Sequence, residues 1–239
     1  MRHACRYRTT HCLLLWLSLC FTGLTVADTA HFKLGGMHGH PLNPLGVTIL
    51  TEAYAELGIT IELVALPSPR SMELAHRGLL DGELGRIDGV TDMYPNLLKV
   101  DWPIIDLDTV AITSHPTRMF DEKPNLLNYR LGIVRGARIN ERVTYDPDNA
   151  VEVTHSEQLI RMLHTQRIDL AIMPRSVALL LLKQDPELRI LEPSLGVHPI
   201  HHYLHRRHHA LVPKLQQILQ RMAKEGRIAW LEQQFLQQK

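Results

Sequence analysis

The chain has 239 residues and an ordinary globular composition, with 45% hydrophobic and 21% charged residues. This composition excludes a disordered, collagen-like or coiled-coil protein. The 26 basic and 25 acidic residues give a formal net charge of +1. Nucleic-acid binders normally have a basic excess that neutralises phosphates, so we expect no nucleic-acid partner.

The first 27 residues have the pattern of a secretory signal peptide. Arginines within Met1–His11 precede the apolar run Leu13–Phe21, and small residues stand before a cleavage site at Asp28. The run is short for a membrane-spanning helix, which takes about 20 residues. We therefore predict export to the periplasm with cleavage of the signal. The alternatives are a membrane anchor and a lipoprotein modified at Cys20, which the bulky Leu19 disfavours.

All the cysteines of the chain (Cys5, Cys12 and Cys20) lie in this predicted signal. The exported part would therefore have no disulfide, no thiolate nucleophile and no cysteine-bound metal. No later apolar run approaches the length of a membrane span. We expect a soluble exported protein.

Strands and helices alternate along the rest of the chain. We expect strands at 31–34, 59–65, 82–87, 100–112, 129–134, 151–153, 169–173, 188–191 and 200–205. We expect helices at 43–57 and 68–76, from Ala137, after Thr154, at 176–182 and at 211–235. Asn43 is the expected N-cap of the first helix, and Thr154 and Glu157 have capping-box spacing. This alternation predicts an α/β fold with largely parallel sheets.

One unit occurs twice: a helix, a short turn, an aspartate and an apolar strand. It is found at Leu74–Leu84, with Asp81, and at Leu159–Ile172, with Asp169. The two copies are too few and too far apart for a solenoid. They predict two similar lobes.

The order of several segments resembles the bacterial extracellular solute-binding family 3, the periplasmic binding proteins of amino-acid importers. The matching segments are Leu66–Ser71, Leu79–Ile87, Val100–Pro103, Leu131–Gly136, Arg167–Ala171 and Tyr203–Phe235. They are similar to the family's first-lobe helix and third strand, its crossover strand, the start and aspartate turn of its second lobe, and its return strand and closing helices.

The resemblance implies a two-lobed periplasmic-binding-protein-like fold of type 2, each lobe a mainly parallel sheet flanked by helices. The first lobe would comprise residues 28–110 and 200–239, and the second would be the inserted residues 111–199. A small polar ligand, anionic or amino-acid-like, would bind between the lobes and draw them together by hinge closure. The protein would be a monomer that delivers this ligand to an ABC permease, with no catalytic residue.

The chain departs from the family in the residues that bind an α-amino acid. Asp92–Leu98 lacks the arginine that takes the ligand's carboxylate, and Pro174 stands about where the family has an acid for the amino group. Arginines at the ends of predicted strands and helices could substitute, because guanidinium binds carboxylates well. They are Arg86, Arg70, Arg135 and Arg175.

We expect Arg70, Arg86 and Arg135 to contact the ligand, together with His38 in the glycine-rich first loop. Trp102 would form an apolar wall of the cleft. Each of these side chains could instead be structural or exposed, and core packing is an equal alternative for Trp102.

Histidine is unusually frequent, with His38 and His40 in the first loop and a cluster in His198–His209. Imidazole is a common metal ligand. The cluster, however, lacks a His-x-x-x-His arrangement with a glutamate, and it spans a strand in which alternate side chains point apart. We therefore expect no metal and no other cofactor.

Two other functions stay open. The first is a sensing module that presents its ligand to a membrane receptor. The second is a periplasmic dehydratase on the same fold, for which Glu83 is the candidate catalytic group. The sequence has none of the usual hydrolase, metalloprotease, P-loop or dinucleotide motifs, which disfavours other enzymes.

Overall fold

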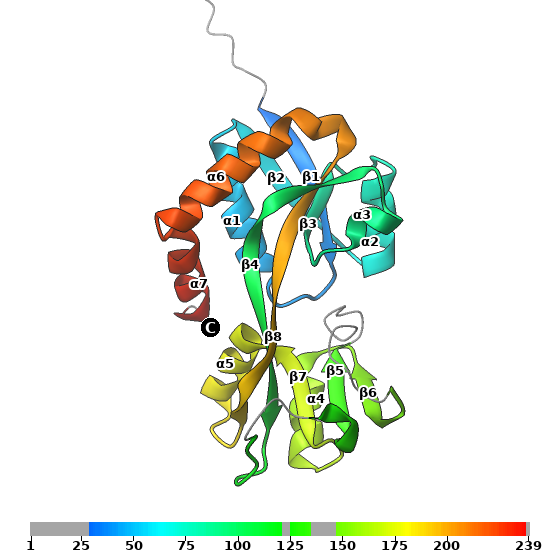
Figure 1. The fold of residues 1–239 in the computed structure, drawn as a ribbon, viewed down its shortest axis with the longest axis vertical. Helices are drawn as coiled ribbons and strands as arrows, with labels where there is room; N and C mark the ends of the chain where they lie inside the picture. Colours follow the sequence, from blue (N-terminus) through cyan, green and yellow to red (C-terminus); the bar gives the residue numbers. More distant parts are fainter. Residues whose placement is uncertain (1–28, 121–124, 135–146, 238–239) are drawn as a thin grey trace, which may run out of the picture.

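The computed structural model describes residues 29–120, 125–134 and 147–237. In these ranges eight strands form one sheet in the order β2-β1-β3-β8-β4-β7-β5-β6, arranged as two lobes (Figure 1). The predicted two-lobed α/β fold is confirmed. The predicted signal peptide and the helix expected from Ala137 lie outside the described residues. No described helix is long and apolar enough to cross a membrane.

The first lobe is built on parallel strands with helices on both faces. Its outer strands are β1 (Ala30–Met37), β2 (Ile59–Leu66) and β3 (Gly82–Arg86), with β1 between the other two. Its helices are α1 (Asn43–Ala55), α6 (Val212–Lys224) and α7 (Arg227–Gln237) on one side and α2 (Ser68–His76) and α3 (Val90–Met93) on the other. A 3-10 helix, η4 (Arg206–Leu211), leads into α6.

The second lobe repeats this arrangement with shorter elements. Its strands are β7 (Leu170–Pro174), β5 (Leu131–Val134) and β6 (Ala150–Val153), with α4 (Ser156–His164), α5 (Arg175–Gln184) and the 3-10 helices η1 (Leu126–Asn128) and η3 (Pro147–Asn149). Successive side chains of β7 enter opposite faces of the sheet. Ala171 and Met173 join the main core, while Leu170 and Ile172 join a second core under η1.

Two long antiparallel strands run through both lobes. They are β4 (Leu97–Thr113) and β8 (Arg189–His205), paired from Leu97 opposite His205 to Thr113 opposite Arg189. The prediction of separate strands at 188–191 and 200–205 was wrong. Prolines are disfavoured inside strands, but the pairing continues past Pro193 and Pro199 with local register shifts.

The predicted lobe boundaries at residues 110 and 200 fall inside β4 and β8. Both strands therefore contribute to each lobe, and the exact division of the chain between lobes stays a prediction.

Three helix ends differ from the sequence prediction. Asn43 is the first residue of α1 and does not cap it; its Nδ2 donates to the Met37 carbonyl at 2.7 Å and ties the helix to β1. The capping box of α4 lies one residue later, where Gln158 accepts the His155 N–H at 3.1 Å. The C-terminal helix is two helices, because Gly226 has φ +74° between α6 and α7.

The predicted repeat is visible in the hydrogen bonds of the two lobes. α2 begins at residue 68 and α4 at 156, and β3 begins at 82 and β7 at 170, so both offsets are 88 residues. Asp81 N donates to the Lys33 carbonyl at 2.8 Å, and its carboxylate accepts the Lys33 N–H at 2.8 Å. Asp169 makes the same two bonds to Arg130, at 2.7 and 3.0 Å.

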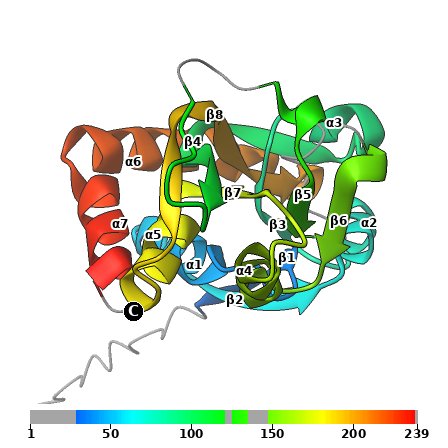
Figure 2. The ribbon, with the colours of Figure 1, turned by 90° about the horizontal axis from the view of Figure 1, so that it is seen from below.

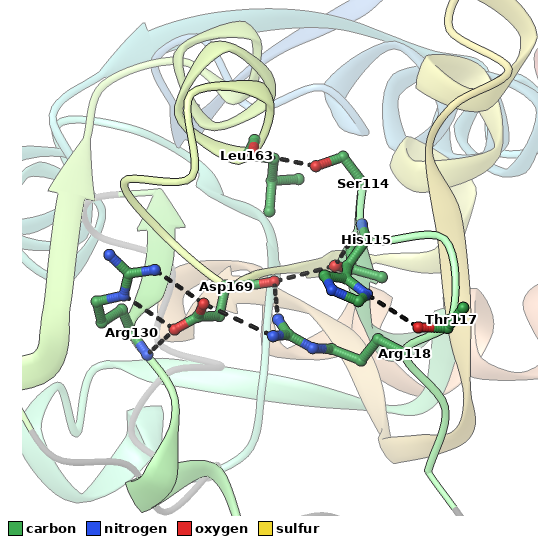
Figure 3. A network of polar contacts seen from close by, with 8 residues as sticks. Ser114, His115, Thr117, Arg118, Arg130, Leu163 and Asp169 are labelled. Carbon is green, nitrogen blue, oxygen red and sulfur yellow. Dashed lines mark hydrogen bonds and ion pairs between the residues drawn. The ribbon is translucent and has the colours of Figure 1, made fainter.

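An arginine closes each of these aspartate turns. Arg207 Nη2 lies 2.5 Å from Asp81, and the Arg130 guanidinium donates to both carboxylate oxygens of Asp169 at 2.9 and 3.0 Å. The bond from Arg130 lowers the pKa of Asp169. Figure 3 shows that Arg118 approaches the same aspartate from the other side, where it donates to the Asp169 carbonyl at 2.9 Å.

The repeat generates a prediction about one backbone position. Gly78 and Gln166 occupy equivalent turns with φ of +72° and +53°, a conformation that costs a non-glycine residue about 1–2 kcal/mol. We expect Gly78→Ala to destabilise the protein by about 1–2 kcal/mol and Gln166→Gly to stabilise it by about 1 kcal/mol. Urea denaturation of both variants measures this. Equal signs for the two substitutions would contradict the equivalence of the turns.

A neutral histidine is buried in the first lobe. His202 is inaccessible to solvent, its Nδ1 donates to the Glu83 carbonyl at 2.8 Å, and its Nε2 accepts the Tyr54 hydroxyl at 2.8 Å. Burial lowers the pKa of His202 from 6.5 to about 4. The imidazole therefore stays uncharged where an exposed histidine takes up a proton.

This burial makes stability depend on pH. Below pH 6.5 His202 becomes protonated in the unfolded chain, whereas in the folded protein it stays neutral down to about pH 4. As the pH decreases from 6.5 to about 4, we expect the free energy of unfolding to fall, with His202 accounting for about 3 kcal/mol of the loss. His202→Gln should remove one proton from the slope of stability against pH. Denaturation at several pH values measures it.

Candidate functional site

A cavity of about 580 Å³ lies between the two lobes. The first lobe lines it with the loop after β1, the start of α2, the end of β3 and the middle of β4, and the second lobe with the end of β7 and the start of α4. The carboxyl ends of β1, β3 and β7 thus converge on it, the usual position of ligand sites in α/β proteins. Ligand pockets commonly have this size.

Most of the cavity wall is apolar. More than half of the lining residues are aliphatic, methionine or proline. Ile104 and Leu107 of β4 and Leu84 of β3 contribute from the first lobe, and Met173 and Val177 from the second. These side chains are almost fully buried, so the cavity continues the hydrophobic core to the boundary between the lobes.

Arg86 is the arginine in the described wall of the cavity. It ends β3, and its Nη2 lies 2.5 Å from Glu83 Oε1 as an ion pair, while its Nε donates to Met72 Sδ at 3.3 Å. Glu83 is completely buried and also accepts the Ser71 hydroxyl at 2.6 Å. Burial raises the pKa of Glu83, and the opposing effects of Arg86 and Ser71 favour the ionised form.

His40 also lines the cavity, and its protonation is affected by the charge of Arg86. Burial, followed by the positive charge of Arg86, lowers the pKa of His40 to about 4. Its Nδ1 accepts the Leu42 N–H at 3.3 Å. In the neutral imidazole the proton is therefore on Nε2, which is left as a hydrogen-bond donor.

The structure places the other expected ligand residues differently. His38 is exposed and lines the cavity. Arg70 is exposed on α2 and lies outside the described wall, although its neighbours Ser68 and Pro69 line it. Trp102 is half-buried against the main core and also lies outside the wall.

The other two arginines of the prediction are Arg135 and Arg175. Arg135 lies outside the described residues. Arg175 is held by Asp108 and by both carboxylate oxygens of Glu192, at 2.6 and 3.0 Å, and these bonds raise its pKa. Its position after β7 was predicted, but its carboxylate partners were not.

Sequence analysis missed the contribution of α4. Thr154 to Glu157, at the start of this helix, face the cavity across from the start of α2. The offset of 88 residues between α2 and α4 could have revealed them, because it places Ser156 opposite Ser68. The repeat was visible in the sequence, but its exact offset depends on helix ends that periodicity does not fix.

The C-terminal histidines have protein partners of several kinds. His201 Nδ1 lies 3.1 Å from the Val100 carbonyl, and His208 Nε2 lies 2.7 Å from Asp81. One described group has metal-ligand types close together: His164, Asp185 and Glu187 at the surface. The two carboxylates flank opposite ring nitrogens of His164, at 2.6 and 3.5 Å, which is an ion-pair arrangement.

Comparison with known structures identifies the fold. The ligand-binding core of GluR0 in complex with L-glutamate superposes with a TM-score of 0.75 at 13% identity, over 87% of this chain and 99% of that one. An ancestral arginine-binding protein bound to arginine gives 0.69 at 14%, over 86% and 98%. A periplasmic binding protein of an arginine transport system from Legionella pneumophila gives 0.67 at 13%, over 86% and 99%.

The chain has the periplasmic-binding-protein fold. This confirms the fold that the resemblance implied. No family model matches the sequence. An uncharacterized protein of Shewanella oneidensis is 29% identical over 196 residues, which cover 78% of this chain and 74% of that protein.

The Arg86–Glu83 pair generates a prediction about stability. Removing one partner of a buried ion pair leaves the other charge without compensation, at a cost of about 3–5 kcal/mol. We expect Arg86→Met to destabilise the protein by about 3 kcal/mol, and Glu83→Gln in the same chain to recover most of that loss. Chemical denaturation of the single and double variants measures it. Additive losses would show that the two side chains do not depend on each other.

Proposed function

We propose that this chain is an exported solute-binding protein that captures a small anionic or amino-acid-like molecule between its lobes and delivers it to a membrane transporter. The observation that carries the proposal is the cavity between the lobes, because both lobes supply its wall. A molecule bound there would contact both lobes at once and favour their closed arrangement.

Arg86 and His38 are the proposed ligand contacts of the first lobe, with Arg70 and Arg135 as further candidates. Arg86 ends β3 within the wall, and His38 belongs to the glycine-rich loop after β1. The similar folds support this reading, since proteins named for binding arginine and a core complexed with L-glutamate are among them. Closure would bend the chain within β4 and β8, where residues 28–110 and 200–239 meet residues 111–199.

The geometry of Glu83 favours binding over catalysis. The enzyme alternative needs this carboxylate in contact with a substrate. Glu83 instead lies outside the described cavity wall, fully buried and bonded to Ser71 and Arg86. A substrate in the cavity would meet Arg86 before it met Glu83.

A thermal-shift screen of the exported protein tests the proposal. The panel comprises amino acids, dicarboxylates, small peptides, polyamines and divalent metals. A ligand at 100 times its dissociation constant adds about 2.7 kcal/mol of stability, which raises the melting temperature measurably. We expect at least one organic anion or amino acid to do so.

A blocked variant shows where such a ligand binds. Ser156→Trp places an indole at the start of α4 in the cavity wall and should abolish the shift. Lys224→Trp, on the exposed end of α6, is the matched control and should retain it. A shift that survives Ser156→Trp would contradict binding between the lobes. Uptake of the labelled ligand by cells with and without the gene then distinguishes transport from sensing.

A further inference from the structure

We propose that the cavity selects a small monocarboxylate with an apolar body and no ammonium group, and so discriminates against free α-amino acids. This inference rests on the proposed function and names the ligand class of the same site. It follows from three features of the described wall: its apolar surface, the placement of its carboxylates, and two hydrogen-bond donors at its polar end.

The apolar surface surrounds the cavity from both lobes. Ile104 and Leu107 line it from the strand that connects the lobes, and Met173 and Val177 line it from the second lobe. A fully polar ligand would displace water from this surface without making hydrogen bonds to it. An aliphatic or aromatic body gains from the same contact, because burial of apolar surface is favourable.

An ammonium group finds no buried acid in the described wall. The carboxylate there is Glu157, which is exposed in the first turn of α4, where the helix dipole already favours its negative charge. Glu83 lies behind the wall and is occupied by Ser71 and Arg86. Pro174, at the equivalent end of β7, offers no charge. Among the described residues of the wall, a desolvated ammonium would therefore have no buried carboxylate to pair with, and an unpaired buried charge is costly.

A carboxylate finds two donors. Arg86 uses Nη2 for Glu83 and Nε for Met72, and its Nη1 has no partner among the described residues. His40 presents Nε2–H, because its Nδ1 accepts the Leu42 N–H. Both residues line the cavity, and in the proposed complex one carboxylate accepts from both groups. Glu83 already pairs with Arg86, and the described wall contains no second arginine and no lysine for a second carboxylate on the ligand.

Calorimetric titration with four compounds of one shape tests the selection. The probes are 3-phenylpropanoate, phenylalanine, 2-phenylethylamine and 3-phenylpropan-1-ol, which differ in the presence of the carboxylate and the ammonium group. We expect 3-phenylpropanoate to bind at least tenfold more tightly than each of the others. In the series propanoate, butanoate and hexanoate, affinity should rise about fourfold for each added methylene group.

The variants avoid the folding cost of an unpaired Glu83. The double variant Glu83→Gln and Arg86→Gln keeps the His40 donor but loses the arginine, so it should lose most of its preference for 3-phenylpropanoate over the alcohol. Arg161→Gln removes an exposed arginine from the end of α4 and should leave the preference intact. Thermal melts of each variant confirm folding before titration.

The outcomes separate this inference from the proposed function. If phenylalanine binds as tightly as 3-phenylpropanoate, or if a dicarboxylate or polyamine binds more tightly, the selection is overturned while a solute-binding function stands. If none of these compounds and no member of the screening panel binds, both are overturned. Retention of the preference in the double variant would overturn the role of Arg86.

Discussion

The antiparallel pairing of β4 with β8 is the constraint on which the rest of the molecule depends. Both strands are 17 residues long and run through both lobes, and each lobe extends from one edge of the pair: β3 joins β8, and β7 joins β4. α7 adds a further link beside α5, where Lys183 Nζ donates to the Leu236 carbonyl (Figure 2). The register shifts near Pro103 and Thr109 are where the pairing is least regular.

The repeated aspartate turn explains why the two lobes present similar edges to the cavity. Asp81 and Asp169 each fix the start of a strand against the backbone of a neighbouring segment. The strands β3 and β7 therefore end at equivalent positions in their lobes. The same offset of 88 residues pairs Arg86 with Pro174 at these ends. The two strand ends are therefore equivalent in position but differ in charge, because β3 ends with an arginine and β7 with a proline.

Sequence alone could predict the architecture because alternation, glycine turns and the aspartate repeat are local signals. Arg86 and His38, which it predicts as ligand contacts, both line the cavity, since strand ends and the first loop are recognisable in the sequence. It could not assign Arg175, whose partners Asp108 and Glu192 are distant in the chain. Nor could it predict the apolar wall. The apolar sequence pattern around Ile104 predicts burial, but it does not tell whether the side chain packs against another side chain or lines a cavity.

The Arg86–Glu83 ion pair is part of the folded core and also lies at the cavity wall, where Arg86 is exposed to a bound molecule in the proposed function. Arg86 ends a strand among apolar side chains, where an uncompensated cation would be costly, and Glu83, three residues earlier, compensates it from the buried side. Ser71 holds that carboxylate in place, and the bare backbone of Gly35 gives the two room, since a Cβ there would collide with Ser71 Oγ and Glu83 Oε2. The same compensation weakens the positive field at the cavity. If the site takes the proposed carboxylate, the direction of its N–H groups matters more than net charge, and the apolar wall supplies the remainder of the affinity.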